Sequence, residues 1–298
     1  MQKENIFFER KLQRDNLKGP LDFKLFLLGL FLLPSAPFIA CVFLIYPLIK
    51  GFIKQKERLF TDKYNIPLIL GSIIMIFKSM ISSLFNQGNN FGEIWDPSLN
   101  WIGLINWIPL FLCFFSFQNY LNTKYQRAIV SKVFIASSIP ILLSGLSQYF
   151  LNLYGPFQIF NGLIIWFQRS PDSLSSYGAG LTSVFSNQNY AGSWLTLIWP
   201  FCLTNFLINQ KKKNKIKKGI IFCICILFVI CIFLTHSRGA ILSLIISLPL
   251  ILGKLSIYIF IPIIILIFLT FCLNLIPFYD YDLNSLIQKI IPNDLFLK

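Results

Sequence analysis

Long apolar runs separated by short polar segments dominate the chain. A membrane hydrocarbon core takes about 20 apolar residues per helix. Six runs approach or reach that length: 65–85, 101–121, 133–151, 190–208, 219–235 and 255–277. A shorter apolar run, 240–253, lies between the last two. This pattern predicts an all-α, polytopic integral membrane protein.

The N-terminal apolar stretch 25–49 allows two interpretations. It is long enough for one kinked span, but Pro34 and Pro37 interrupt its middle. Proline removes a backbone donor and restricts the residue before it, so helices tend to end there. The stretch is then a hairpin of two short arms that turns at 34–37. With the hairpin, the chain has about nine transmembrane helices.

Positive charges choose between these interpretations, because cytoplasmic loops carry an excess of Lys and Arg. The hairpin with a cytoplasmic N-terminus puts 21 of the 26 Lys and Arg inside and four outside, with Lys78 within a span. A single span would put 10 inside and 15 outside. The sequence therefore predicts a cytoplasmic tail 1–24, a transmembrane domain 25–277 and a C-terminus on the periplasmic side of an inner membrane.

Composition agrees with a lipid environment. Hydrophobic residues make up 55% of the chain and charged residues 13%, whereas a soluble domain is about a quarter charged. These values exclude a soluble enzyme and a disordered chain. The net charge of +14 follows from orientation and contact with anionic lipid heads, so membrane lipids are expected partners and nucleic acid is not. The seven cysteines lie in apolar runs and predict no metal site.

The loops expected on the periplasmic side are 86–100 and 152–189, and the basic loop 209–218 is expected in the cytoplasm. The longer outer loop contains the apolar segment 156–167, PFQIFNGLIIWF. This segment is too short to span, so we expect it to form a re-entrant or interfacial helix.

Two polar motifs flank the basic loop 209–218. Asn187 and Asn189 lie at the start of one apolar run, where carboxamides and free helix N–H groups can bind a sugar or phosphate or simply cap the helix. Arg238 follows the next run, within Thr235-His236-Ser237-Arg238-Gly239. An arginine at membrane depth is costly and suits a diphosphate, although it can also close a helix turn. His236, the single histidine, and Lys78 admit structural and functional interpretations.

Read together, these motifs resemble the O-antigen ligase/polymerase superfamily. The matching pattern is F-x-N-x-N-Y, a basic loop, and T-x-S-R-G-A, while DPSLNWIGLINWIPLF and GLIIWFQR resemble its cyanobacterial members. The resemblance implies a glycosyltransferase-C-like fold that transfers glycan from undecaprenyl diphosphate to a glycolipid acceptor, without metal or other cofactor. It makes Arg238 the catalytic diphosphate contact. Substrate-binding residues would be Arg169, Asn187, Asn189 and Ser237.

The chain also departs from this family. Members continue into a large periplasmic loop with a further arginine and a histidine that activates the acceptor, and we expect 278–298 to be the start of a truncated loop of this kind. The resemblance therefore leaves the enzyme assignment open. Alternatives are a transporter of a small solute such as inorganic carbon, or an inactive remnant.

Overall fold

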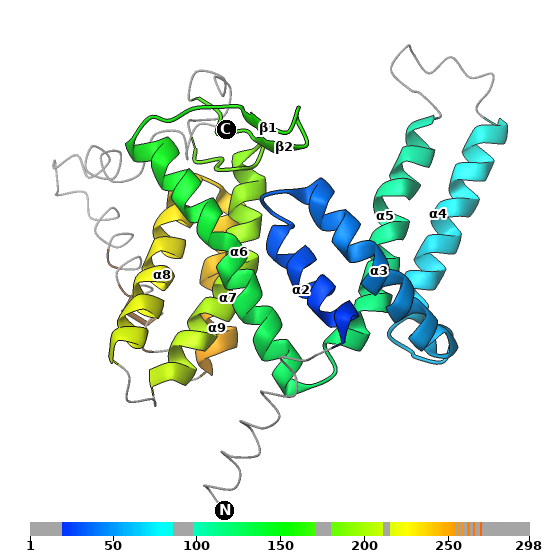
Figure 1. The fold of residues 1–298 in the computed structure, drawn as a ribbon, viewed down its shortest axis with the longest axis horizontal. Coiled ribbons are helices and arrows are strands. Elements are labelled where there is room, and N and C mark those ends of the chain that lie inside the picture. Colours follow the sequence, from blue (N-terminus) through cyan, green and yellow to red (C-terminus); the bar gives the residue numbers. More distant parts are fainter. Residues whose placement is uncertain are drawn as a thin grey trace, which may run out of the picture. The chain divides into compact units, whose positions relative to one another are not determined.

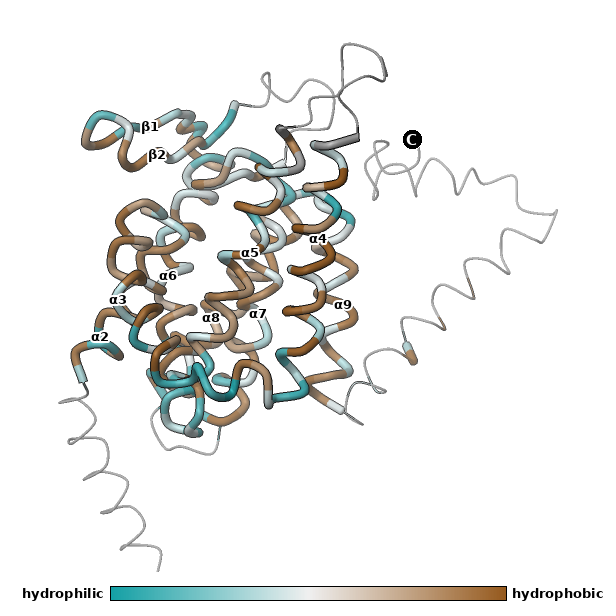
Figure 2. The backbone as a smooth tube through the Cα atoms, turned by 90° about the vertical axis from the view of Figure 1, so that its right-hand side faces the viewer, coloured by the Kyte–Doolittle hydropathy of each residue, from teal (hydrophilic) through white to brown (hydrophobic). Residues whose placement is uncertain are grey.

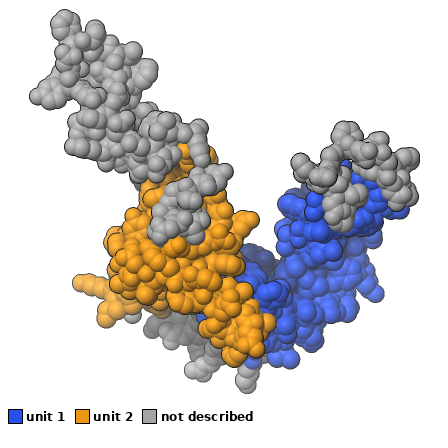
Figure 3. Space-filling view, turned by 90° about the horizontal axis from the view of Figure 1, so that it is seen from above, with its two compact units in different colours: residues 1–137 blue, residues 138–298 orange. Residues whose placement is uncertain are grey.

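The computed structural model describes residues 20–85, 98–170, 180–210 and 215–253, with scattered positions between 256 and 269. The expected span 255–277 therefore lies almost entirely outside the described residues. The chain divides into two compact units, residues 1–137 and 138–298 (Figure 3). We describe each unit by itself.

Helices form nearly all of the described chain (Figure 1). Eight α-helices are described: α2 (Leu21–Leu32), α3 (Pro37–Gln55), α4 (Ile66–Phe85), α5 (Ser98–Phe117), α6 (Lys124–Phe150), α7 (Gln188–Gln210), α8 (Lys215–Leu234) and α9 (Arg238–Leu252). Short 3₁₀ turns follow α3 and α5: η1 (Lys56–Arg58) and η2 (Gln118–Tyr120). One antiparallel pair of strands lies among the described residues: β1 (Phe157–Ile159) and β2 (Ile164–Trp166).

Six of these helices are long and apolar enough to cross a membrane: α3, α4, α5, α6, α7 and α8. Figure 2 shows them hydrophobic along most of their length. The 12 residues of α2 and the 15 of α9 extend only about 18 and 23 Å, against a hydrocarbon core of about 30 Å. The described chain is thus a helical, polytopic membrane protein with six helices of spanning length, while three of the nine expected spans are either short or outside the described residues.

Helix ends extend beyond the apolar runs. α6 begins at Lys124, nine residues before the predicted run at 133, and α8 begins at Lys215 rather than 219. Charged residues at these ends are poor in hydrophobicity but good helix formers. Apolar runs therefore locate the bilayer-facing part of a helix and underestimate its length.

The predicted break of the N-terminal apolar stretch into two helices at 34–37 is confirmed. α2 ends at Leu32, the turn holds Pro34, and α3 begins at Pro37, where proline needs no backbone donor. The N–H groups of Ser35 and Ala36 donate to the Leu32 carbonyl at 3.1 and 2.8 Å. α2 begins at Leu21, four residues before the predicted apolar stretch at 25.

The core of unit 1 is aromatic and lies where α2 meets the end of α5 and the start of α6. Its buried members are Phe23, Phe26, Leu30, Tyr120 and Val130. The ring centroids of Phe26 and Tyr120 lie 4.9 Å apart, and those of Phe26 and Phe117 lie 5.0 Å apart. This packing holds the short helix α2 in place although it cannot span a bilayer alone.

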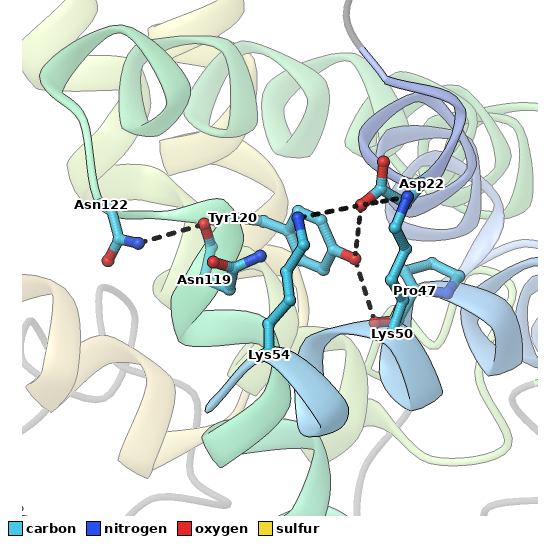
Figure 4. A network of polar contacts seen from close by, with 7 residues as sticks. All are labelled: Asp22, Pro47, Lys50, Lys54, Asn119, Tyr120 and Asn122. Carbon is cyan, nitrogen blue, oxygen red and sulfur yellow. Dashed lines mark hydrogen bonds and ion pairs between the residues drawn. The ribbon is translucent and has the colours of Figure 1, made fainter. Parts of the chain in front are cut away.

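A polar network borders this core (Figure 4). Asp22 is fully buried, and its Oδ2 lies 3.3 Å from Lys50 Nζ and 3.8 Å from Lys54 Nζ. The Tyr120 hydroxyl lies 3.3 Å from the same Asp22 oxygen and 3.1 Å from the Pro47 carbonyl. The network joins α2, α3 and η2.

Unit 2 is built on α7, which packs against both α8 and α9. Buried side chains on these three helices include Leu195, Ile198, Cys202, Cys225, Phe228, Cys231, Ile232, Ala240 and Leu244. The Sγ atoms of Cys202 in α7 and Cys225 in α8 lie 3.1 Å apart. Trp194 Nε1 donates to Ser138 Oγ at 3.0 Å, which ties α7 to the C-terminal half of α6.

The prediction of a helix at 156–167 is wrong, because the segment forms a β-hairpin. Phe157 pairs with Trp166 and Ile159 with Ile164. Asn161 and Gly162 form the turn with φ of 52° and 88°, and Leu163 N donates to Phe160 O at 3.1 Å. Positive φ at both central residues defines a type I′ turn, for which Asn-Gly is the favoured pair.

Candidate functional site

The candidate site lies at the end of unit 2 where α7 and α9 begin. We call it the α7/α9 end and define it as residues 180–190 and 235–240. Leu181 N donates to Leu234 O at 2.8 Å, and Gly180 N donates to Gln188 Oε1 at 3.1 Å. A Cβ at Gly180 would collide with Thr235 O and Gln188 Oε1, so only glycine allows this approach of the loop to the α8–α9 turn.

The first turns of α7 and α9 touch each other. A Cβ on Gly192 would lie 2.7 Å from Ala240 Cβ and 3.2 Å from both Ser237 Cβ and Thr235 Oγ1. The contact lies one helical turn after Asn189 and two residues after Arg238. The two polar motifs that the sequence singled out are therefore neighbours at one end of unit 2.

Asn187 acts as the N-cap of α7. Its Oδ1 accepts from Asn189 N at 2.7 Å, and its backbone carbonyl accepts from Tyr190 N and Ala191 N. This is the capping alternative that the sequence left open, because a side-chain oxygen occupies a free first-turn N–H. The side chains of Asn187 and Asn189 are both exposed.

Ser237 performs the same role for α9. Its Oγ accepts from Ala240 N at 3.4 Å, and its own N–H donates to Thr235 Oγ1 at 3.3 Å. With 6% of its surface exposed, Ser237 shapes the helix start rather than reaching outward.

Arg238 is the first residue of α9 and is exposed. His236 precedes it by two residues, is also exposed, and has a left-handed φ of 53°. Its N–H donates to Phe233 O at 3.0 Å. The turn therefore ends α8 sharply and starts α9 with an arginine at its positive end.

Arg169 reaches the same end of unit 2 through its backbone. Its N–H donates to Thr182 Oγ1 at 3.1 Å, and its carbonyl accepts from Gln148 Nε2 at 2.8 Å. The side chain is exposed. Thr182 belongs to the loop that packs on the α8–α9 turn. This loop therefore contacts or adjoins the segments that carry all five predicted site residues: Arg169, Asn187, Asn189, Ser237 and Arg238.

Two buried glutamines, which sequence reasoning did not select, hold this loop. Gln148 Oε1 accepts from Thr182 N at 3.0 Å and Ser183 N at 2.8 Å, while its Nε2 also donates to Thr182 Oγ1 at 3.0 Å. Gln168 Nε2 donates to Ser144 O at 2.9 Å. The available signal was a carboxamide in an apolar run, since a buried amide needs partners for all its polar atoms.

The other features singled out in the sequence are Lys78 and the cysteines. Lys78 lies in α4 of unit 1 and is exposed. In the part of the chain that the structure describes, no three His, Cys, Asp or Glu side chains gather as metal ligands. The six cysteines described there are free thiols, and Cys272 lies outside the described residues.

Among the described residues, the α7/α9 end carries positive charge. Arg238 belongs to this end and Arg169 is hydrogen-bonded to its loop; both are exposed, and the described residues of unit 2 include no Asp or Glu. The N-termini of α7 and α9 add partial positive charge from their first-turn N–H groups. Comparisons of the chain with protein-family models, curated proteins and solved structures found no match.

Proposed function

We propose that this protein handles a polyprenyl-diphosphate-linked glycan in cell-surface polysaccharide synthesis, as an O-antigen ligase-like transferase. The observation that carries the proposal is the contact between the first turns of α7 and α9. It brings together the helix starts that carry Asn189 and Arg238, although about 50 residues and a basic loop separate them in the sequence. These are the residues on which the family resemblance rests.

Electrostatics supports an anionic ligand at this end. Two helix N-termini side by side favour a phosphate group, and Arg238 starts one of these helices. A guanidinium suits a diphosphate because it donates two parallel hydrogen bonds. Arg169 supplies a second exposed guanidinium on the same network.

The proposed chemistry is glycosyl transfer with diphosphate as the leaving group. An acceptor hydroxyl attacks the sugar carbon, the bond from that carbon to the diphosphate oxygen breaks, and the hydroxyl proton leaves to a base. Arg238 offsets the charge that grows on the departing diphosphate, a form of electrostatic stabilisation. Asn189 is free to hydrogen-bond the sugar or the diphosphate. Asn187 and Ser237 shape the two helix starts.

The proposal includes an orientation. The charge split puts the α7/α9 end on the periplasmic side of an inner membrane, where the lipid-linked glycan is presented. Within unit 2, Lys215, Lys217 and Lys218 start α8, and the α8–α9 turn lies at the other end of that helix. This arrangement agrees with basic residues in the cytoplasm.

Binding is the first test. The full chain in nanodiscs is titrated with fluorescent undecaprenyl-diphosphate glycan. Loss of charge-assisted hydrogen bonds in Arg238→Ala costs about 1.5 to 3 kcal/mol, which corresponds to roughly 10- to 150-fold weaker binding. Arg58→Ala is the matched control, because Arg58 is an exposed arginine in η1 of unit 1. This variant should bind the donor with the affinity of the parent. Equal affinities of the Arg238→Ala variant and the parent would remove Arg238 from the site.

Transfer is the second test. If proteoliposomes with the labelled donor and a glycolipid acceptor yield acceptor-linked glycan, Arg238→Ala should slow this transfer by about 100- to 1,000-fold. Arg238→Lys keeps the charge but loses two-point bonding, so an intermediate rate is expected. Donor binding without any transfer by the parent would reduce the function to recognition of the lipid-linked glycan.

A further inference from the structure

The β1–β2 hairpin exposes a large apolar surface at its tip. β1 is exposed on both of its faces, and Phe160, beside the turn, is 72% exposed. The other exposed hydrophobic side chains of the hairpin are Phe157 at 44%, Ile159 at 54% and Leu163 at 44%. Apolar side chains of this size rarely gather on a surface that faces only water.

The hairpin is attached directly to a helix of spanning length. α6 ends at Phe150, and its charged residues Lys124, Arg127 and Lys132 all lie in its first third. The following 18 residues to Phe150 are uncharged and extend about 27 Å, close to the thickness of the hydrocarbon core. The end of α6 therefore lies near a bilayer surface.

The charge-free stretch continues through the hairpin. No Asp, Glu, Lys, Arg or His occurs from Val133 to Gln168. The end of α6 and its connection to β1 are rich in exposed aromatic and aliphatic side chains: Tyr149, Phe150, Leu151, Leu153 and Tyr154. Tyr and Trp favour the boundary between lipid and water, and an uncharged segment pays no desolvation penalty for ions there.

The base of the hairpin is held firmly on unit 2. Gly155 N donates to Gln168 O at 3.0 Å, which closes the base, and Gln168 N donates to Ser183 O at 3.0 Å. Phe167 N donates to Val184 O at 3.3 Å. Gln168 is only 3% exposed. These bonds connect the apolar tip to the loop that leads into Asn187.

We propose that the β1–β2 hairpin is a membrane-interface anchor, whose tip residues Phe160 and Leu163 insert among the lipids of the leaflet at which α6 ends. The partner is the lipid surface, argued from the position of the hairpin at the end of a span and from its lack of charge. The anchor fixes the height of the α7/α9 end above the bilayer through Gln168 and Ser183. This inference does not depend on the proposed function.

Spin labels test the insertion. In a Cys-free background, single cysteines at Phe160, Leu163 and Asn122 are labelled in nanodiscs, and collision with oxygen is compared with collision with a water-soluble nickel chelate. Asn122 is exposed in the turn before α6 and serves as the aqueous control. Labels at 160 and 163 should meet oxygen preferentially. Nickel accessibility equal to that at 122 would overturn the proposal.

A protein partner instead of lipid would give another signature. If a second copy of the chain covers the tip, labels at 160 should show dipolar broadening that disappears when labelled protein is diluted with unlabelled protein. That outcome also overturns the lipid assignment.

A charge substitution tests whether Phe160 anchors the tip. With the label at 163, Phe160→Asp should abolish the preference for oxygen because a carboxylate is costly within lipid, whereas Phe160→Leu should keep it. Thermal unfolding of both variants reports whether they remain folded. An unchanged oxygen preference at 163 in a folded Phe160→Asp protein would show that Phe160 does not hold the tip in the membrane.

Discussion

Asp22 illustrates how a single buried charge organises unit 1. Burial alone raises the pKa of this carboxyl, because it disfavours the ionised form. The hydrogen bond and charge of Lys50, with the charge of Lys54, act in the opposite direction and outweigh it, so that the pKa lies below its ordinary value of 3.8. Among the described residues, Asp22 Oδ1 has no hydrogen-bond partner, which makes the ion pairs the main compensation for burial.

Asp22→Asn should lower the stability of the protein at neutral pH. Loss of the charge-assisted contacts costs about 1 to 3 kcal/mol, seen as a lower apparent melting temperature in detergent. Since the folded pKa is depressed, the contribution is present above pH 3.8 and is lost as the pH falls through the folded pKa. The melting temperature of the parent should therefore fall when the pH drops below 3.8 and through the folded pKa of Asp22. The melting temperature of Asp22→Asn should not show this additional fall. Glu57→Gln, an exposed acid in η1, is the control, and a melting temperature of Asp22→Asn equal to that of the control would contradict the prediction.

Gln148 should control the order of the loop at the α7/α9 end. Gln148→Leu leaves Thr182 N and Ser183 N without their acceptor in a buried site, and each unsatisfied group costs about 1 to 3 kcal/mol. Hydrogen–deuterium exchange of a peptide spanning 180–187 should accelerate by roughly 5- to 150-fold.

Asn106→Leu provides the comparison for Gln148→Leu. Asn106 is an exposed carboxamide in α5 of unit 1, and its loss should leave exchange at 180–187 unchanged. Equal exchange in the parent and in Gln148→Leu would mean that Gln148 is not what orders the loop.

The helices and strands differ in how well the local sequence predicts them. Pro34 and Pro37 indicated the break between α2 and α3, because proline acts on the backbone of its neighbours, and the distribution of Lys and Arg was needed to choose the hairpin. For 156–167, length and hydropathy favoured a helix and were misleading. The local signal was Asn161-Gly162, flanked on both sides by aromatic and β-branched residues, which favours a two-residue hairpin turn.

The packing of α7 against α8 predicts that two cysteines can be crosslinked. Cys202 and Cys225, with Sγ atoms 3.1 Å apart, should form a disulfide when copper-phenanthroline accepts the two electrons from the thiols. A variant that keeps only these cysteines and carries a protease site at 211–214 should remain one band after cleavage on a non-reducing gel, and separate into two fragments on reduction.

A matched pair makes the crosslinking specific. Cys223 lies two residues from Cys225 but is exposed on another face of α8, so a variant with only Cys202 and Cys223 should separate after cleavage. Crosslinking of both pairs with equal yield would show that helix collisions, rather than the described packing, bring the thiols together.

At the scale of the whole molecule, the distribution of positive charge predicts the orientation of the chain in the membrane. A cysteine replacing Lys54 or Lys213 should be protected in spheroplasts from a membrane-impermeant thiol reagent, and one replacing Ser175 should react, because the basic segments belong in the cytoplasm. Lys213 and Ser175 lie outside the described residues, so this test rests on the sequence. Reaction of the Lys213 site in intact spheroplasts would invert the proposed orientation.

The candidate site could be anticipated only in part. Asn187 and Arg238 stand out because polar groups interrupt apolar runs, and the short connection between α7 and α8 favours neighbouring helices. The adjacency of the two helix starts depends on Gly180 and Gly192, whose missing side chains allow close approach. Gln148 meets Thr182 across 34 positions, and no local pattern indicates such a pairing.

The Asp22 network also bears on how the protein is made. Twelve residues are too few for α2 to enter the membrane alone, so α2 and α3 should be inserted together as a hairpin, with Lys50 and Lys54 already opposite Asp22. Tyr120, which completes the network, follows Asp22 by 98 positions. At about 5 to 20 residues per second, the ribosome delivers it roughly 5 to 20 seconds later. During that interval only Lys50 and Lys54 compensate the buried charge of the Asp22 carboxylate. The packing of unit 1 can be completed only after α5 and Tyr120 have been synthesised.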